Sequence, residues 1–304
     1  MTEGYDALRR GAAFVDVSAR GRIVARGRDR ARLLHNLSSN EVKKMTPGSG
    51  CYAFLLSPQG RIQADLYLLC FEDHFLIETE ADLREKVFQH IRRYIIADQV
   101  ELEDVTAQTS EVALEGPGSA AILAALGAPV PGGACEHLPW GEATIAAISI
   151  TGQPGFRIFG AEGILGKLDS AGARPATEED LRQVRIENGK PRYGEDIREN
   201  SLPQETQQMH AVSFTKGCYL GQEIVERIRA QGHVNKKLVR VEIDSAEAPA
   251  AGTKLTAGGA EAGEITSAVF APELGKAVAL AYVRTPHANP ATELKAGESR
   301  ALVE

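Results

Sequence analysis

The sequence predicts an α+β protein in which two mixed parts are followed by a small β-barrel. Strand-like runs follow one another at hairpin spacing, and single amphipathic helices interrupt them. After about residue 235 the chain changes to short strands separated by Gly, Pro and Ala. Hairpin spacing favours antiparallel pairing over a doubly wound parallel sheet. We therefore expect residues 1–234 to form the mixed region and residues 235–304 the barrel.

The first strands are apolar runs bounded by turn residues. "GRIVARG" (21–27) predicts a strand, and Asp29 is placed to cap a short helix over "RARLLHNL". Turn residues at Pro58–Gly60 and Glu72–His74 separate the runs that follow. These runs predict three consecutive strands, at residues 51–57, 62–71 and 75–80.

Two helices have strong sequence signals. "DLREKVFQHIRRYII" begins at Asp82 and carries one apolar stripe, formed by Leu83, Val87, Ile91 and Ile95. In "EEDLRQVRIENG", Thr177 and Asp180 form a capping box, and Gly189 and Pro191 end the helix. Weaker signals predict strands at residues 100–105, 111–116, 143–150 and 155–160, and short helices in "GSAAILAALG" and "AEGILGKLDSAG".

Composition excludes several classes of protein. Hydrophobic residues make up 43% of the chain, which is enough for a sizeable core. The net charge of −7 argues against a general binder of nucleic acid or of a membrane surface. The N-terminal "MTEGYDALRR" lacks the apolar core of a signal peptide, and no run approaches membrane-spanning length. We expect a cytoplasmic protein.

The four cysteines, at positions 51, 70, 135 and 218, are scattered. They form no C-x-x-C pair, and no histidine cluster has metal-ligand spacing, so no resident metal or Fe–S site is expected. Free thiols of this kind are typical of the cytosol. Cys70 lies inside an apolar strand and is expected to be packed there.

Cys218 stands in a different setting, "KGCYLGQE" (216–223). Leu220, Ile224 and Ile228 have helical spacing, so a helix is expected from Tyr219 to about Arg229. Cys218 would then lie at the helix N-terminus, where backbone amides favour an anion. Lys216 adds positive charge, and both effects lower a thiol pKa below its free value of about 8.5.

The other residues of this segment fit a reactive thiol. Gly217 would permit a tight entry, and Gly221 would let a backbone or a flat ligand come close. Glu223 opposes the lowering of the thiol pKa in part. The alternative is that Cys218 is a small buried hydrophobic residue behind a glycine turn.

Glu187 is predicted in the last turn of its helix, at the negative end of the helix dipole. One interpretation is a surface carboxylate paired with Lys190 or Arg192. The other is a carboxylate that turns inward and accepts two parallel hydrogen bonds from a flat amino-pyrimidine edge.

A basic run follows the cysteine segment. It is either a solvated face or a basic wall beside a cleft, which would suit an anionic ligand tail. Its members are Arg227, Arg229, His233, Lys236, Lys237 and Arg240.

These stretches together resemble one family. "KGCYLGQE", followed by Arg227, Gly232 and a Lys-Lys pair, resembles the YgfZ-type folate-binding proteins, which are relatives of the glycine-cleavage T-protein (aminomethyltransferase). Three further segments are similar to that superfamily: "FVDVSARGRIVARGRDR", "PGSGCYAFLLSPQGRIQADLYLL" and "VRIENGKPRYGEDI". The resemblance implies a three-part ring, in which two intertwined α+β subdomains and a C-terminal barrel surround a central folate hole.

The resemblance also implies roles for single residues. Glu187 would hold the pterin ring, Asp65 would lie at the reactive folate nitrogen, and Arg227 would help to bind tetrahydrofolate. Cys218 would serve in making or repairing Fe–S clusters. The supporting motif residues are Lys216, Gly217, Tyr219, Gly221, Gln222 and Glu223.

Three functions follow as expectations. The first is a folate-binding accessory protein for assembly or repair of Fe–S clusters, with client enzymes or assembly proteins as partners. Because a cluster usually takes four protein ligands, a lone cysteine favours a transient role. The second is a tetrahydrofolate-dependent aminomethyl- or methyltransferase in which Asp65 acts at the folate nitrogen. The third is an interaction scaffold with a vestigial pocket.

Overall fold

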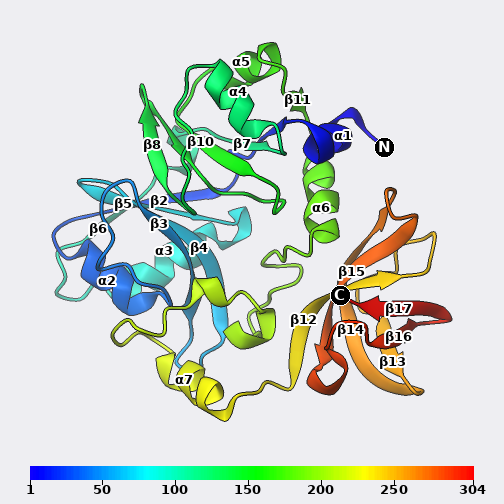
Figure 1. The fold of residues 1–304 in the computed structure, drawn as a ribbon. Helices are drawn as coiled ribbons and strands as arrows, with labels where there is room; N and C mark the ends of the chain where they lie inside the picture. Colours follow the sequence, from blue (N-terminus) through cyan, green and yellow to red (C-terminus); the bar gives the residue numbers. More distant parts are fainter.

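The computed structural model describes residues 1–304 and contains three β-sheets. Two open sheets carry the first two-thirds of the chain, and a closed barrel carries the last part (Figure 1). This is the predicted α+β class with a C-terminal barrel. No helix combines the length and the apolar character that crossing a membrane requires.

The first open sheet is antiparallel, with strand order β3-β4-β5-β2-β6. Its strands are β2 (Gly21–Arg26), β3 (Gly50–Leu56), β4 (Ile62–Cys70), β5 (His74–Thr79) and β6 (Glu101–Asp104). Helices α2 (Arg30–Leu37) and α3 (Arg84–Arg93) pack on it through Leu33, Val87 and Ile91. These elements confirm the sequence prediction. Asp29 precedes α2 but does not cap it, because its carboxylate accepts from the backbone N–H of Gln99 at 2.9 Å.

The second open sheet has strand order β11-β1-β7-β10-β9-β8. Its strands are β1 (Ala13–Asp16), β7 (Glu111–Glu115), β8 (His137–Trp140), β9 (Ala143–Ala146), β10 (Gly155–Phe159) and β11 (Arg174–Pro175). Alternation along β1 sends Phe14 toward α4 (Ser119–Ala125) and α5 (Ile164–Ser170). Val15 points to the other face, toward α1 (Glu3–Arg10) and α6 (Glu178–Glu187). The capping box of Thr177 and Asp180 at the start of α6 is present.

The two open sheets are intertwined through the chain order. Strand β1 belongs to the second sheet, the chain then builds the whole first sheet from β2 to β6, and it returns to the second sheet at β7. Val24 and Leu69 of the first sheet share an apolar cluster with Ala146 and Phe159 of the second. Between α6 and α7 (Gln222–Gln231) the chain has short 3-10 turns at Pro203–Thr206 and Met209–Ala211.

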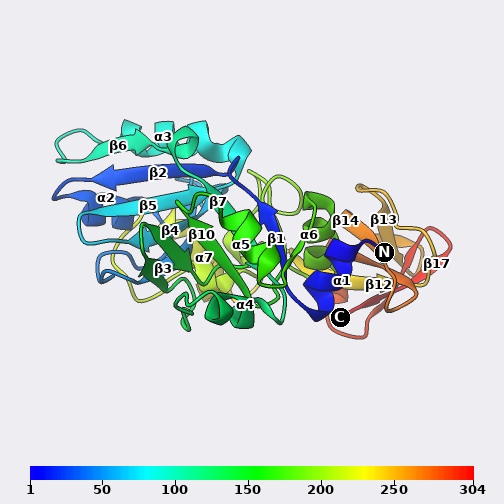
Figure 2. The ribbon, with the colours of Figure 1, turned by 90° about the horizontal axis from the view of Figure 1, so that it is seen from above.

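The barrel closes in the order β12-β15-β14-β13-β16-β17. Its strands are β12 (Lys236–Ile243), β13 (Lys254–Ala257), β14 (Ala260–Ala271), β15 (Lys276–Arg284), β16 (Glu293–Ala296) and β17 (Ser299–Val303). It lies at one end of the molecule, with α1 and α6 between it and the open sheets (Figure 2). Helix α6 packs against β14 and β15. We propose the segment between α7 and β12 as the domain boundary.

Candidate functional site

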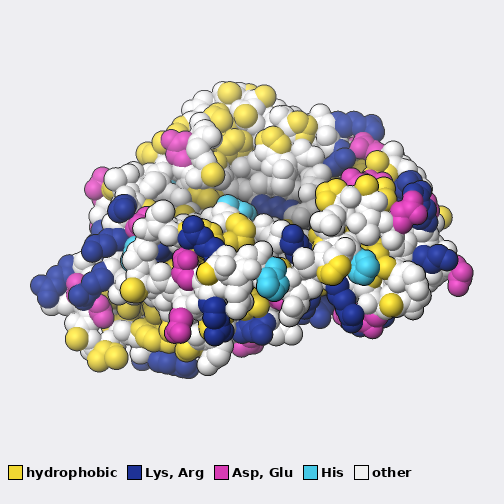
Figure 3. Space-filling model, turned by 60° about the horizontal axis from the view of Figure 1, so that its bottom comes forward, with side chains coloured by type: hydrophobic (Ala, Val, Ile, Leu, Met, Phe, Trp, Pro, Cys, Tyr) yellow, Lys and Arg dark blue, Asp and Glu magenta, His cyan; other side chains and the backbone are white.

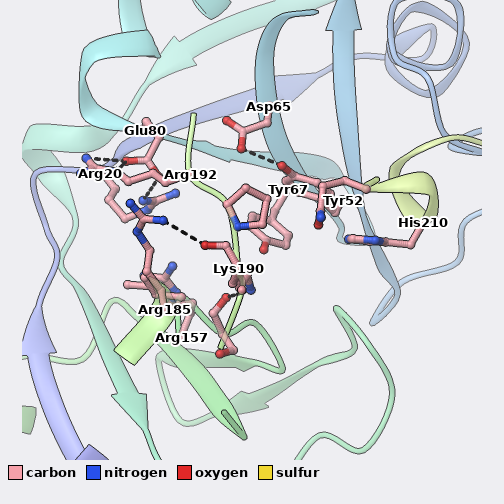
Figure 4. A pocket seen from close by; sticks show the side chains of 15 residues that line it. Arg20, Tyr52, Asp65, Tyr67, Glu80, Arg157, Arg185, Lys190, Arg192 and His210 are labelled. Atoms are coloured by element: carbon pink, nitrogen blue, oxygen red, sulfur yellow. Dashed lines mark hydrogen bonds and ion pairs between the residues drawn. The ribbon is translucent and has the colours of Figure 1, made fainter. Parts of the chain in front are cut away.

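A cavity of about 300 Å³ lies where both open sheets meet the segment that follows α6 (Figure 4). The barrel contributes no residue to its wall. Most of the lining side chains are polar or charged, including Arg20, Tyr52, Asp65, Tyr67, Glu80, Arg157, Arg185, Lys190, Arg192 and His210. Figure 3 shows one face of the molecule hollowed near its centre, with basic and histidine side chains around the hollow.

Asp65 is the carboxylate that β4 presents to this cavity. The hydroxyl of Tyr52, on the neighbouring β3, donates to its Oδ2 at 2.7 Å. The Tyr52 ring lies 5.0 Å from the Tyr67 ring and stacks on His210 at 5.4 Å between ring centroids. Burial, and next the negative charge of Glu80, raise the pKa of Asp65 to about 6. Near neutral pH this carboxylate can therefore both hold and release a proton.

Glu80 is a fixed negative charge in the same wall. Arg20 Nη1 lies 2.6 Å from its Oε1, and Arg192 Nε donates to its Oε2 at 3.0 Å. Burial opposes its ionisation, but the two guanidinium groups outweigh burial and lower its pKa to about 2. Because Glu80 stays ionised, its field helps to keep the proton on Asp65.

Cations outnumber carboxylates in the wall. Two buried arginines hold it to the scaffold: Arg157 Nη1 lies 3.2 Å from Glu111, and Arg185 Nη1 lies 2.7 Å from Asp196. Arg157 reaches the wall from β10 and Arg185 from α6. The guanidinium and ammonium groups of the wall favour a ligand with anionic or carbonyl oxygens.

The structure does not bring Glu187 to this cavity. Its carboxylate accepts from the hydroxyl of Tyr5 at 3.0 and 3.1 Å and from Gln183 Nε2 at 3.1 Å, and Arg9 Nε lies 3.7 Å away. Burial raises its pKa. Neither Lys190 nor Arg192 is its partner, so the surface pairing considered from the sequence is absent. Its role at a pterin ring stays a prediction, and its contacts to α1 do not favour that role.

The surroundings of Cys218 differ from those expected. Helix α7 begins at Gln222, so the exposed Cys218 lies outside its first turn, and the expected contribution of the helix dipole is lost. The ammonium of Lys216 turns inward and donates to the carbonyls of His35, Ser38 and Asn40 at 2.5 to 2.7 Å. Burial lowers the pKa of Lys216 to about 8. Cys218 is thus an exposed thiol and not a packed hydrophobic residue.

The neighbours of Cys218 serve the scaffold. Tyr219 is buried in an apolar cluster with Phe54 and Val225. Gly221 has φ +84°, and a Cβ there would lie 2.6 Å from the carbonyl oxygen of Ser57. The close backbone approach expected at Gly221 is therefore present, and it is made by the β3–β4 turn. A Cβ at Gly217 would meet only His35, at 3.9 Å, so no tight entry requires glycine there.

Gln222 and Glu223 are the first two residues of α7, and Glu223 is exposed.

The basic run contributes nothing to the wall of the cavity. Arg227 is exposed, whereas Lys236 lies over the Tyr282 ring at 4.5 Å and Arg240 donates to the backbone of Glu187 at 2.8 Å. The basic wall is instead supplied by Arg20, Arg157 and Arg185, which sequence analysis did not single out, and by Lys190 and Arg192, which it considered only as partners of Glu187. Alternation along β4 would have placed Tyr67 on the same face as Asp65, but Arg20 and Glu80 carry no comparable local signal.

Comparison with known proteins agrees with this architecture. The model of the GCVT N-terminal domain matches residues 1–216, and the model of the glycine cleavage T-protein C-terminal barrel domain matches residues 236–300. The chain belongs to the glycine-cleavage T-protein (GCVT) family. The family-level resemblance and the expected T-protein-like fold are thereby confirmed, and the narrower YgfZ-type assignment remains a proposal.

Several known proteins resemble this chain over most of their length. The aminomethyltransferase of Rubrobacter xylanophilus is 31% identical, with 92% of this chain and 78% of that protein covered. A putative chloroplastic transferase of Arabidopsis thaliana is 26% identical, with coverages of 97% and 71%. The crystal structure of the glycine cleavage system aminomethyltransferase T of Bartonella henselae has the same fold, with a TM-score of 0.89 at 23% identity, covering 99% of this chain and 87% of that one.

Proposed function

We propose that this protein is a folate-dependent one-carbon transferase of the GCVT family. In this proposal the cavity around Asp65 binds tetrahydrofolate, and an aminomethyl or methyl group is transferred there. The relatives named aminomethyltransferase support this function over the accessory role that we placed first from the sequence. The observation that carries the proposal is the Asp65 carboxylate, held by the Tyr52 hydroxyl, inside a cavity with aromatic and basic walls.

The cavity suits a reduced folate in shape and in donor set. Tyr52, Tyr67 and His210 offer flat surfaces on which a bicyclic ring can lie. Asp65 is an acceptor for ring N–H groups, and the cations of the wall can donate to ring carbonyl or carboxylate oxygens. A volume of about 300 Å³ is at the lower end of ligand pockets and holds the ring system rather than the whole molecule.

The residues of the chain divide the work in this proposal. When bound, tetrahydrofolate supplies the nitrogen that accepts the one-carbon unit. Asp65 holds or accepts a proton at that nitrogen and stabilises positive charge beside it. The Tyr52 hydroxyl fixes the orientation of the Asp65 carboxylate, and Glu80 keeps the pKa of Asp65 close to the working pH.

The test combines binding with turnover. We expect the wild type to bind 5-formyltetrahydrofolate in calorimetry and to show tetrahydrofolate-dependent glycine cleavage or demethylation of an N-methylated amino acid. Asp65→Asn should lower turnover by about 100-fold or more, because removal of a positioned acid–base group typically has an effect of this size. The control is Asp169→Asn, an exposed carboxylate on α5, which should behave as the wild type. Equal turnover in both variants would reject the assignment of Asp65.

The accessory role in Fe–S cluster assembly or repair is a second candidate because of one observation. Cys218 is an exposed thiol held between two anchored neighbours, since Lys216 and Tyr219 are both buried. Partners would be Fe–S client enzymes. Deleting the gene and restoring it as wild type or as Cys218→Ser tests this role, with the activity of a client Fe–S enzyme normalised to its protein level. Restoration by wild type alone supports the thiol, whereas unchanged client activity after deletion rejects the role.

A further inference from the structure

Lys190 differs from every arginine in the wall of the cavity. Each arginine has a carboxylate partner: Arg20 and Arg192 pair with Glu80, Arg157 with Glu111, and Arg185 with Asp196. Lys190 has no carboxylate within 4.0 Å. Its ammonium has one partner among protein atoms, the backbone carbonyl of Ser149. Two of its three N–H donors are therefore free to meet a ligand.

The backbone holds Lys190 in place against the cavity. Its N–H donates to the carbonyl of Arg185 at 2.8 Å, and its own carbonyl accepts from Arg185 Nη1 at 2.9 Å. Gly189, with φ +71°, makes the turn that brings Lys190 back toward Arg185. Figure 4 shows the Lys190 side chain among the residues that line the cavity.

The charge of Glu115 acts on Lys190, but its carboxylate forms no direct ion pair with the ammonium and is bound by other donors. The oxygens of Glu115 already accept from Ser149 Oγ at 2.8 Å, the backbone N–H of Ile150 at 2.5 Å and Thr151 Oγ1 at 2.6 Å. Burial lowers the pKa of Lys190 in spite of the opposing charge of Glu115, and no carboxylate lies within 4.0 Å of its ammonium. An anionic ligand would supply the missing charge.

We propose that Lys190 is the residue that recognises a carboxylate of the ligand in this cavity. This inference rests on the proposed function and limits its ligands to those that carry a carboxylate. The carboxylate has two chemical sources, the glutamate of the folate itself or a small amino-acid donor of the one-carbon unit. In both cases the ammonium of Lys190 meets a carboxylate that the protein itself does not place within 4.0 Å of it.

Four ligands and four proteins test the proposal. Calorimetry compares 5-formyltetrahydrofolate, 5-formyltetrahydropteroyl amide (called the pteroate below, which lacks the glutamate and carries no carboxylate), sarcosine and sarcosine amide, which lacks the carboxylate. The proteins are wild type, Lys190→Met, Lys190→Arg and the control Lys167→Met, which removes an exposed lysine of α5. We expect Lys190→Met to weaken the binding of the carboxylate-bearing ligand by about 10- to 100-fold and Lys190→Arg to retain most of the wild-type affinity.

The pattern of loss identifies the source of the carboxylate. Weaker binding of the folate with unchanged binding of the pteroate assigns Lys190 to the glutamate. Weaker binding of sarcosine with unchanged folates assigns it to a small donor. Equal loss for folate and pteroate, or no loss for any ligand in Lys190→Met, overturns the proposal. If the wild type binds neither folate nor pteroate, the proposed function fails instead, and the sarcosine arm still tests Lys190 without folate.

Discussion

At the scale of single residues, Asp65 combines its proposed chemical role with an energetic penalty. Its pKa of about 6, against an ordinary value of 3.8, means that the folded state holds its proton more tightly than the unfolded chain. The contribution of Asp65 to the free energy of unfolding therefore falls as the pH rises from about 4 to about 6. Conflict of this kind between stability and function is common at active sites.

Replacing Asp65 with asparagine should relieve this penalty. We expect the stability advantage of Asp65→Asn over the wild type to grow by about 1 kcal/mol between pH 5 and pH 7.5, because only the wild type loses a proton from a buried site in that range. Urea unfolding at the two pH values measures it, with Asp169→Asn as the control. A pH-independent difference between Asp65→Asn and the wild type would show that Asp65 ionises as an ordinary carboxyl.

Cys218 should be separable from the fold. Because the side chain is exposed, Cys218→Ser is expected to change the free energy of unfolding by less than about 0.5 kcal/mol. Lys216→Met, two residues earlier, should cost several times more, since it leaves three backbone carbonyls without their donor. Chemical denaturation compares the two variants. A large loss in Cys218→Ser would contradict the exposed placement.

At the scale of elements, hydrophobic alternation and turn residues were enough to predict most strands, but not all. The strands that the sequence did not predict, β8, β11 and β16 among them, are two to four residues long. In addition, β8 contains Pro139 and β11 contains Pro175, and proline weakens a strand pattern. The start of α7 was placed too early, because Tyr219 and Leu220 continue the apolar spacing while Gly221, with φ +84°, ends it. Tertiary contact with the β3–β4 turn decides that boundary.

Gly221 is expected to be the most sensitive residue at this boundary. In Gly221→Ala the new methyl group would clash with the Ser57 carbonyl in addition to requiring a left-handed backbone. Gly232→Ala, at the other end of α7, meets the backbone requirement alone, because nothing lies within 4 Å of its Cβ position. We expect a loss of about 1 kcal/mol for Gly232→Ala and about 1 to 3 kcal/mol more for Gly221→Ala in urea unfolding. Equal losses of stability in the two variants would mean that the β3–β4 turn moves to make room for the new methyl group.

At the scale of the whole molecule, one buried carboxylate joins the two open sheets. Glu111 on β7 pairs with Arg22 of the first sheet at 3.0 Å and with Arg157 on β10 at 3.2 Å. All three side chains are almost fully buried. The sequence contained no sign of this contact, because each of its residues belongs to an ordinary strand pattern. The Asp65 site was predictable only through family resemblance, because its wall is assembled from both open sheets and from the segment that follows α6.

Removing the charge of Glu111 should loosen the junction of the sheets. Glu111→Gln leaves two buried guanidinium groups without a counter-ion, and breaking a buried pair in this way costs about 3 to 5 kcal/mol. The control is Glu293→Gln, which removes an exposed pair with Arg300 and should cost less than about 1 kcal/mol. Thermal unfolding of both variants gives the comparison. Similar melting temperatures would show that water or a rearranged arginine compensates the loss.

The interleaved path of the chain has a consequence for its synthesis. Strand β1 leaves the ribosome before the first sheet, yet its partner β7 begins only at Glu111, after the entire first sheet has been made. At a translation rate of about 5 to 20 residues per second, the apolar "AFV" of β1 waits about 5 to 20 s for a neighbour. The nascent chain therefore carries an open strand edge while β2 to β6 fold, and this interval is when it is most exposed to aggregation.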